Sequence, residues 1–257
     1  GAANANITGA TITGGGATGT GVIKDGTGTM TLTKVDISGV KVGIQVTSGN
    51  LTVNMGEIKD VQTGIDMSGS GKLVVNNGAR ITVKNGVGNY GVKVGREVTA
   101  NLTDVRIEGM GSGKGVIMES SQTLTINGGE IKNVEKAVLM KEGTVTMTGV
   151  QISGVKMGVE AIKGTLEIKD GTTITFESGE KNYGVKVGKL VESARLTDVR
   201  IEGTGGNGVG VYGEGARAVT LDGVNISNVS EGVLMKGGGT LTIKEGSIGF
   251  KGGADNY

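Results

Sequence analysis

Apolar and polar residues alternate in short runs along most of the chain. The clearest stretch lies between Val35 and Met55, where the runs VDIS, GIQV and NLTVN follow one another, separated by glycine, serine or lysine. Alternation with a period of two is typical of a β-strand that buries one face. Three such strands within about 21 residues predict one coil of a solenoid.

One isoleucine marks the first strand of each coil, and successive members lie 21 to 27 residues apart. A period of this size, without proline, predicts stacked β-strands. We therefore expect an all-β chain that forms a right-handed parallel β-helix of roughly ten coils, about 50 Å long. A less regular, glycine-rich coil over 1–34 precedes the others and contains Ile12. The remaining members are Ile37, Ile58, Ile81, Ile107, Ile131, Ile152, Ile174, Ile201, Ile226 and Ile248.

The second strand of most coils begins with glycine, followed by alternating aliphatic residues, and the third strand has patterns such as LTV and LTI. We expect valine, isoleucine, leucine and methionine to point inward, with threonine and charged residues outward. The repeated glycine indicates a corner that needs a positive φ or a close approach of the backbone. Its members are Gly43, Gly64, Gly91, Gly115, Gly158, Gly184, Gly208 and Gly232.

A longer repeat is superimposed on the coils. NYGVKVG at Asn89 recurs at Asn182, and LTDVRIEG at Leu102 recurs at Leu196. We interpret 1–257 as one β-helix domain in which 79–171 and 172–257 are related four-coil blocks, the second incomplete. The final Asn256-Tyr257 repeats the beginning of NYGVKVG, and no polar cap is evident, so we expect the chain to be a fragment.

Composition leaves little chemistry for catalysis. The chain has 52 glycines, no proline, cysteine, tryptophan or histidine, and a net charge of +1. Without histidine or cysteine there is no catalytic triad or imidazole metal site, and the aspartates are scattered. We expect no enzyme activity and no cofactor. The small net charge gives no general attraction to nucleic acid, and no apolar run approaches the ~20 residues that span a membrane.

Charged residues flank the repeated isoleucine on the outward side. Arg106 and Glu108 in one coil precede Glu130 and Lys132 in the next. Glu57 likewise precedes the cation of the following coil. Opposite charges on neighbouring strands stabilise a ladder by roughly 0.2–1 kcal/mol per pair, so we interpret them as structural.

The two longest coils, 79–104 and 172–198, contain the NYGVKVG segments. Each has extra residues before the second strand (84–88 and 177–181) and a longer corner after it (96–100 and 189–193). Insertions in solenoids often form the binding face, and tyrosine and arginine are favoured at interfaces. The alternative is that the tyrosines only cover a corner. The candidate partner-binding residues are Tyr90, Lys93, Arg96, Tyr183, Lys186, Lys189 and, as a third protruding position, Tyr212.

The run GGEIKNVEKAVLMKEGTVTMTGVQISGVKMGVEAIKGTLEIKDGTTITF resembles passenger domains of bacterial autotransporters, and more narrowly the repetitive passengers of Bartonella autotransporters. The resemblance covers essentially the whole chain. It implies export through the periplasm and outer membrane, and a protein that is secreted or held at the bacterial surface. No signal peptide or translocator barrel of that family is recognised, which implies an isolated passenger piece.

Within that family, the resemblance implies a secreted proangiogenic ligand of a vascular endothelial growth factor receptor on endothelial cells. A surface adhesin or self-associating rod is the alternative function. Binding of glycosaminoglycan through Lys93, Arg96, Lys186 and Lys189 is compatible with either, with an affinity that falls as salt rises.

Overall fold

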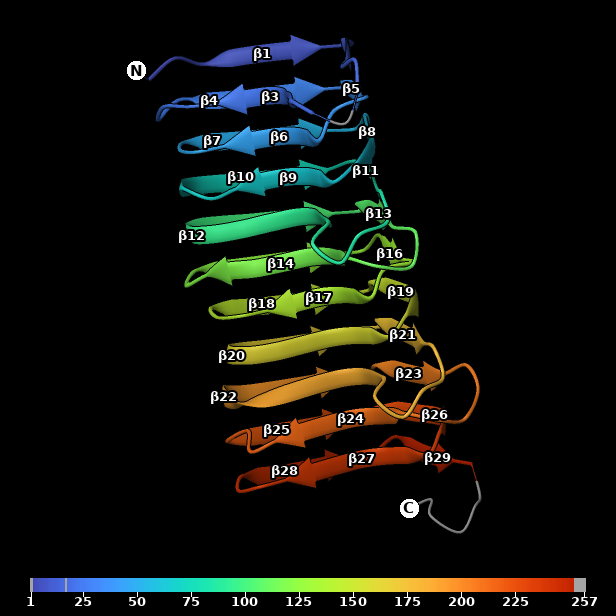
Figure 1. The fold of residues 1–257 in the computed structure, drawn as a ribbon. Coiled ribbons are helices and arrows are strands. Elements are labelled where there is room, and N and C mark those ends of the chain that lie inside the picture. The colour runs from blue at the N-terminus through green and yellow to red at the C-terminus, as the bar shows by residue number, and fades with distance from the viewer. Residues whose placement is uncertain (1, 17, 252–257) are drawn as a thin grey trace.

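The computed structural model describes residues 2–16 and 18–251 and shows a parallel β-helix. These described residues contain 29 strands and no helix. The strands stack in coils into a rod, with the N-terminus at one end and the last coil at the other (Figure 1). They form an 11-stranded sheet and an 18-stranded sheet. The all-β fold and the coil repeat expected from the sequence are therefore confirmed.

The 11-stranded sheet contains the first strand of each coil. The isoleucine ladder is continuous, because each member pairs with the next from Ile12 to Ile248. The strands are β2 (Thr11–Thr13), β5 (Asp36–Ser38), β8 (Glu57–Val61), β11 (Arg80–Val83), β13 (Arg106–Glu108), β16 (Glu130–Lys132), β19 (Gln151–Val155), β21 (Thr173–Phe176), β23 (Arg200–Gly203), β26 (Asn225–Val229) and β29 (Ser247–Phe250).

The 18-stranded sheet joins the second and third strands of the coils. Second strands are β3 (Thr20–Lys24), β6 (Val42–Val46), β9 (Thr63–Met67), β14 (Lys114–Ser120), β17 (Lys136–Met140), β24 (Val209–Glu214) and β27 (Glu231–Lys236). Third strands are β1 (Ala5–Thr8), β4 (Thr29–Thr33), β7 (Asn50–Asn54), β10 (Ser70–Asn76), β15 (Thr123–Asn127), β18 (Thr144–Thr148), β25 (Ala218–Asp222) and β28 (Thr240–Lys244). Three long strands serve as both, and these are β12 (Tyr90–Thr103), β20 (Met157–Lys169) and β22 (Tyr183–Thr197).

These long strands correct one expectation about the two long coils. The residues after the second strand, 96–100 and 189–193, do not form a loop outside the sheet, because β12 and β22 continue through them. The turn in β12 is made at Arg96, which has a φ of 49°. The extra residues before the second strand do form loops, and both lie on the same side of the rod, beside the 11-stranded sheet (Figure 1).

The interior is one hydrophobic cluster that runs from Val22 to Val229 and is aliphatic except for Phe176. An exception is Lys24, which points inward and is only 4 % exposed. Its ammonium group donates hydrogen bonds to the carbonyl oxygens of Gly26 at 2.6 Å and Ser48 at 2.8 Å. Burial lowers the pKa of Lys24, while the nearby Asp25 carboxylate opposes this. Backbone carbonyls therefore satisfy a cation at an inward position where the sequence pattern predicted an apolar residue.

The glycine at the start of the second strand is required by close packing and not by φ. A Cβ built at Gly158 would lie 2.4 Å from the carbonyl oxygen of Gly184 and 2.4 Å from Cγ2 of Ile174. The same two neighbours, a backbone oxygen and an isoleucine methyl group, confront Gly21, Gly43, Gly64, Gly91, Gly115, Gly184 and Gly210. None of these glycines has a positive φ.

Our assignment of Gly208 to this column is wrong by two residues. Val185 pairs with Val211, and Gly210 is the residue whose backbone oxygen lies beside Gly184. The run GVGV repeats with a period of two, so its pattern fits either register. The observed register places Tyr212 on the outer face, paired with Lys186.

The outward charges form the expected ladder. Arg106 pairs with Glu130, and Glu108 pairs with Lys132, whose Nζ lies 3.6 Å from the Glu108 carboxylate. Arg80 pairs with Glu57 on one side, as predicted, but faces the like charge of Arg106 on the other.

Candidate functional site

The two long coils place their tyrosines in one column on the outer face of the second strands. Tyr90 pairs with Lys114, and the column continues through Lys136 and Met157 to Tyr183. Four coil spacings separate the tyrosines, or about 19 Å. The lysines three residues further on, Lys93 and Lys186, occupy a second outward column. The two segments therefore present corresponding residues on the same face.

In the first block these residues are tied to acidic neighbours. The Tyr90 hydroxyl donates a hydrogen bond of 2.7 Å to Asp66, and Lys93 forms an ion pair of 3.4 Å with Glu119. Burial alone would raise the pKa of Glu119, but hydrogen bonds and charge from Lys141 and Lys93 outweigh it, so the pKa is lowered. Arg96 is exposed. Tyr90 and Lys93 are therefore each held by a contact with an acidic neighbour.

Tyr90 is expected to stay neutral at a pH where an exposed tyrosine ionises. Burial raises its pKa above the usual 10, and the hydrogen bond to Asp66 and that carboxylate's charge add to the effect. Because the folded pKa is the higher one, this contribution to stability is present below pH 10 and is lost as pH rises above it. Alkaline titration of tyrosinate absorbance should show a late-ionising phenol that Tyr90→Phe removes. The difference between the titration curves of the unmodified chain and Tyr90→Phe reports Tyr90 alone. An ordinary tyrosine pKa in that difference would contradict the prediction.

In the second block the tyrosine is part of an aromatic stack. The rings of Tyr183 and Tyr212 lie 5.2 Å apart with an interplanar angle of 18°. Lys186 Nζ lies 5.8 Å and 5.7 Å from their centroids and pairs with Glu160 at 3.9 Å and Glu214 at 3.6 Å. Tyr212 is only 9 % exposed, so it does not protrude as predicted but supports Tyr183 from the next coil.

Two exposed aliphatic residues lie beside this stack and were not predicted from the sequence. Ile162 is 42 % exposed and Leu190 is 55 % exposed, and both line a surface hollow of about 250 Å³ together with Lys186 and Lys189. A second hollow of about 330 Å³ shares Lys189 and Leu190 and reaches Arg217. We call Ile162, Lys186, Lys189, Leu190 and Arg217 the Leu190 surface.

Local backbone irregularity creates this surface. The pairing of β20 with β22 shifts register between Ala161 and Lys163, and again between Gly164 and Thr165. Such bulges re-aim side chains and are frequent beside functional sites. At Gly188 a Cβ would meet the backbone of Ala161 and Ile162 at 3.2 to 3.4 Å, so the floor of the hollow lacks a side chain.

The corresponding surface of the first block is polar. A Cβ at Gly95 would contact Ser68, just as a Cβ at Gly188 would contact Ile162. When the two NYGVKVG segments are aligned, Arg96-Glu97 corresponds to Lys189-Leu190. Ser68 and Glu97 are exposed. We call Ser68, Lys93, Arg96 and Glu97 the Glu97 surface. The duplication therefore presents one apolar and one polar version of the same surface, and comparing the two repeats in sequence would have revealed this.

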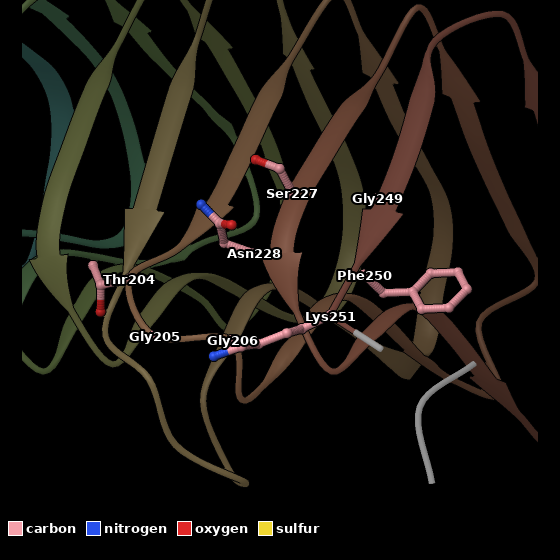
Figure 2. A pocket seen from close by; sticks show the side chains of 8 residues that line it. All are labelled: Thr204, Gly205, Gly206, Ser227, Asn228, Gly249, Phe250 and Lys251. Atoms are coloured by element: carbon pink, nitrogen blue, oxygen red, sulfur yellow. The ribbon is translucent and has the colours of Figure 1, made fainter. Parts of the chain in front are cut away.

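Another hollow, of about 440 Å³, lies at the end of the rod formed by the last described coils. Figure 2 shows the Lys251 side chain reaching toward Gly205 and Gly206, while the Phe250 ring points away from Asn228. The remaining lining is glycine with Thr204 and Ser227. It offers neither carboxylates nor a shared apolar floor, so we place the candidate site at the Leu190 surface.

Within residues 2–16 and 18–251, no group of three or more aspartate or glutamate residues is positioned to hold a metal ion. In the same part of the chain, no helix is long and apolar enough to cross a membrane. No known protein family matches the chain, and neither the curated proteins nor the solved structures include a match.

Proposed function

We propose that this chain is the passenger of a bacterial autotransporter, secreted or held at the cell surface, and that it acts as a ligand of a host cell-surface receptor. The expected partner is a vascular endothelial growth factor receptor on endothelial cells, which makes the chain a proangiogenic agonist. The support is the sequence resemblance and a fold of the kind that the resemblance implies. The chemistry of the outer face then decides where such a partner binds.

The main structural support for a binding role comes from the Leu190 surface. Exposed isoleucine and leucine side chains lie beside a half-buried tyrosine and exposed cations. Contacts of this kind, an apolar centre with arginine and tyrosine around it, are enriched in protein–protein interfaces. The rigid strands beneath hold the side chains in place, which lowers the entropic cost of binding.

Glycosaminoglycan binding through the four predicted cations is less favoured. Lys93 is paired with Glu119, and Lys186 lies between Glu160 and Glu214. A sulfated polysaccharide would have to compete with these carboxylates, and it has no apolar surface to cover Ile162 and Leu190. The partner is therefore proposed to be a protein.

The test is binding of the purified chain to an immobilised vascular endothelial growth factor receptor ectodomain, together with receptor phosphorylation on endothelial cells. We expect saturable binding that Ile162→Ser/Leu190→Glu abolishes. The matched control Arg96→Ala/Glu97→Ala, on the Glu97 surface, should bind like the unmodified chain. Absence of binding with concentration-dependent self-association would instead support the adhesin function.

A further inference from the structure

In the described part of the chain, two cations of the Leu190 surface have no acidic partner within ion-pair distance, whereas their lysine neighbours do. Lys163 is paired with Glu142 at 3.2 Å, and Lys186 with two glutamates. Within 2–16 and 18–251, Lys189 and Arg217 form no ion pair. Two unneutralised cations therefore share one hollow.

These cations lie next to the exposed aliphatic residues. Leu190 and Lys189 line both hollows, Ile162 lines the first, and Arg217 lines the second. The backbone fixes this proximity, because the amide of Arg217 donates a hydrogen bond of 3.2 Å to the carbonyl of Val191. The surface thus presents an apolar centre between two cationic positions. Glu192 also lines the second hollow, and Glu160 and Glu214, both paired with Lys186, line the first.

Resting on the proposed function, we infer that the Leu190 surface binds an acidic peptide segment of its partner that carries an aliphatic side chain. The aliphatic side chain covers Ile162 and Leu190, and the carboxylates face Lys189 and Arg217. A polyanion without apolar groups leaves the two aliphatic residues in water, and a basic peptide meets two uncompensated cations. Complementarity of both charge and hydrophobicity selects this partner chemistry.

The duplicated block provides an internal comparison for the Leu190 surface. The Glu97 surface has serine in place of Ile162 and glutamate in place of Leu190. An acidic segment would lose its apolar contact there and face a carboxylate instead. The two copies of the repeated unit therefore differ in binding specificity. Of the two corresponding surfaces, the Leu190 surface binds the acidic segment and the Glu97 surface does not.

The experiment measures fluorescence polarisation of a labelled peptide of alternating glutamate and leucine with the full chain. The glutamate–serine and lysine–leucine peptides serve as comparisons. We expect the glutamate–leucine peptide to bind, with an affinity that falls as salt rises. Lys189→Glu, Arg217→Glu and Ile162→Ser/Leu190→Glu should each weaken binding about tenfold or more, a typical loss for a central contact.

The charge-matched control is Arg96→Glu, which changes the net charge by the same amount at the corresponding position of the first block. It should leave peptide affinity unchanged. The inference would be overturned if Arg96→Glu and Lys189→Glu lowered the affinity for the glutamate–leucine peptide equally. It would also be overturned if the glutamate–serine peptide bound as tightly as the glutamate–leucine peptide. Receptor binding without peptide binding would overturn it too while leaving the proposed function intact.

Discussion

Replacement of Gly158 by valine is expected to destabilise the rod by more than about 3 kcal/mol, beyond the usual range for overpacking. Even one added carbon would lie 2.4 Å from the carbonyl oxygen of Gly184, and that oxygen belongs to the backbone and cannot rotate away. The adjacent coil carries Tyr183 and Leu190, so the candidate site should loosen as well. Urea unfolding followed by circular dichroism and tyrosine fluorescence measures the effect.

The control for this prediction is Ala137, which occupies the same column in the preceding coil, since Val138 pairs with Val159. The buried methyl group of Ala137 shows that this coil accommodates one carbon in the column, whereas valine at Gly158 adds three. Ala137→Gly should cost only about 1 kcal/mol, from backbone entropy and lost burial. If Gly158→Val unfolds within about 1 kcal/mol of the unmodified chain, close packing is not what requires glycine in this column.

Phe176→Ala is expected to cost about 3–5 kcal/mol, as for other fully buried phenylalanines. The ring is completely buried. It pairs with Val155 in the preceding coil but with Gly203 in the next, so no paired side chain is available to fill the cavity from that side. The segment before Val209 packs nearby, because a Cβ at Gly208 would lie 2.8 Å from the ring, and it would also lie 2.9 Å from the carbonyl oxygen of Asn182, directly before Tyr183.

Hydrogen exchange distinguishes local from global effects of this change. In a solenoid, each coil contacts only its neighbours, so protection should be lost mainly over 172–198 and the adjacent coils. Phe176→Leu keeps most of the volume and should cost less than about 1.5 kcal/mol. Uniform loss of protection along the whole rod would show that the coils unfold as one unit instead.

The regular part of the fold could be predicted because one residue type repeats in one structural role. The isoleucine ladder has the register predicted from the spacing, since the isoleucines from Ile12 to Ile226 each have a polar residue on both sides. Gly208 was misassigned because the run GVGV fits two registers equally well. The close approach of Gly210 to Ile226 and the outward position of Tyr212 identify Gly210 as the member of the glycine column.

The site was predicted only in part for a different reason. Tyr183 and Lys186 stood out as a repeated motif, but their partners Glu160 and Glu214 come from neighbouring coils. Leu190 was treated as one residue of an inserted corner, although its exposure depends on two register shifts between β20 and β22. Bulges alter which face a side chain occupies, and alternation alone does not locate them.

The direction of the backbone hydrogen bonds has a mechanical consequence. Because all strand pairs are parallel and stacked from coil to coil, the ladder bonds run along the rod and each coil is tied to the next by one layer of them. A pulling force applied at the two ends loads these layers in series and peels the outermost coil first. Each released coil of 21 to 27 residues lengthens the chain by roughly 70–90 Å, so the rod yields stepwise under tension while resisting compression along its axis.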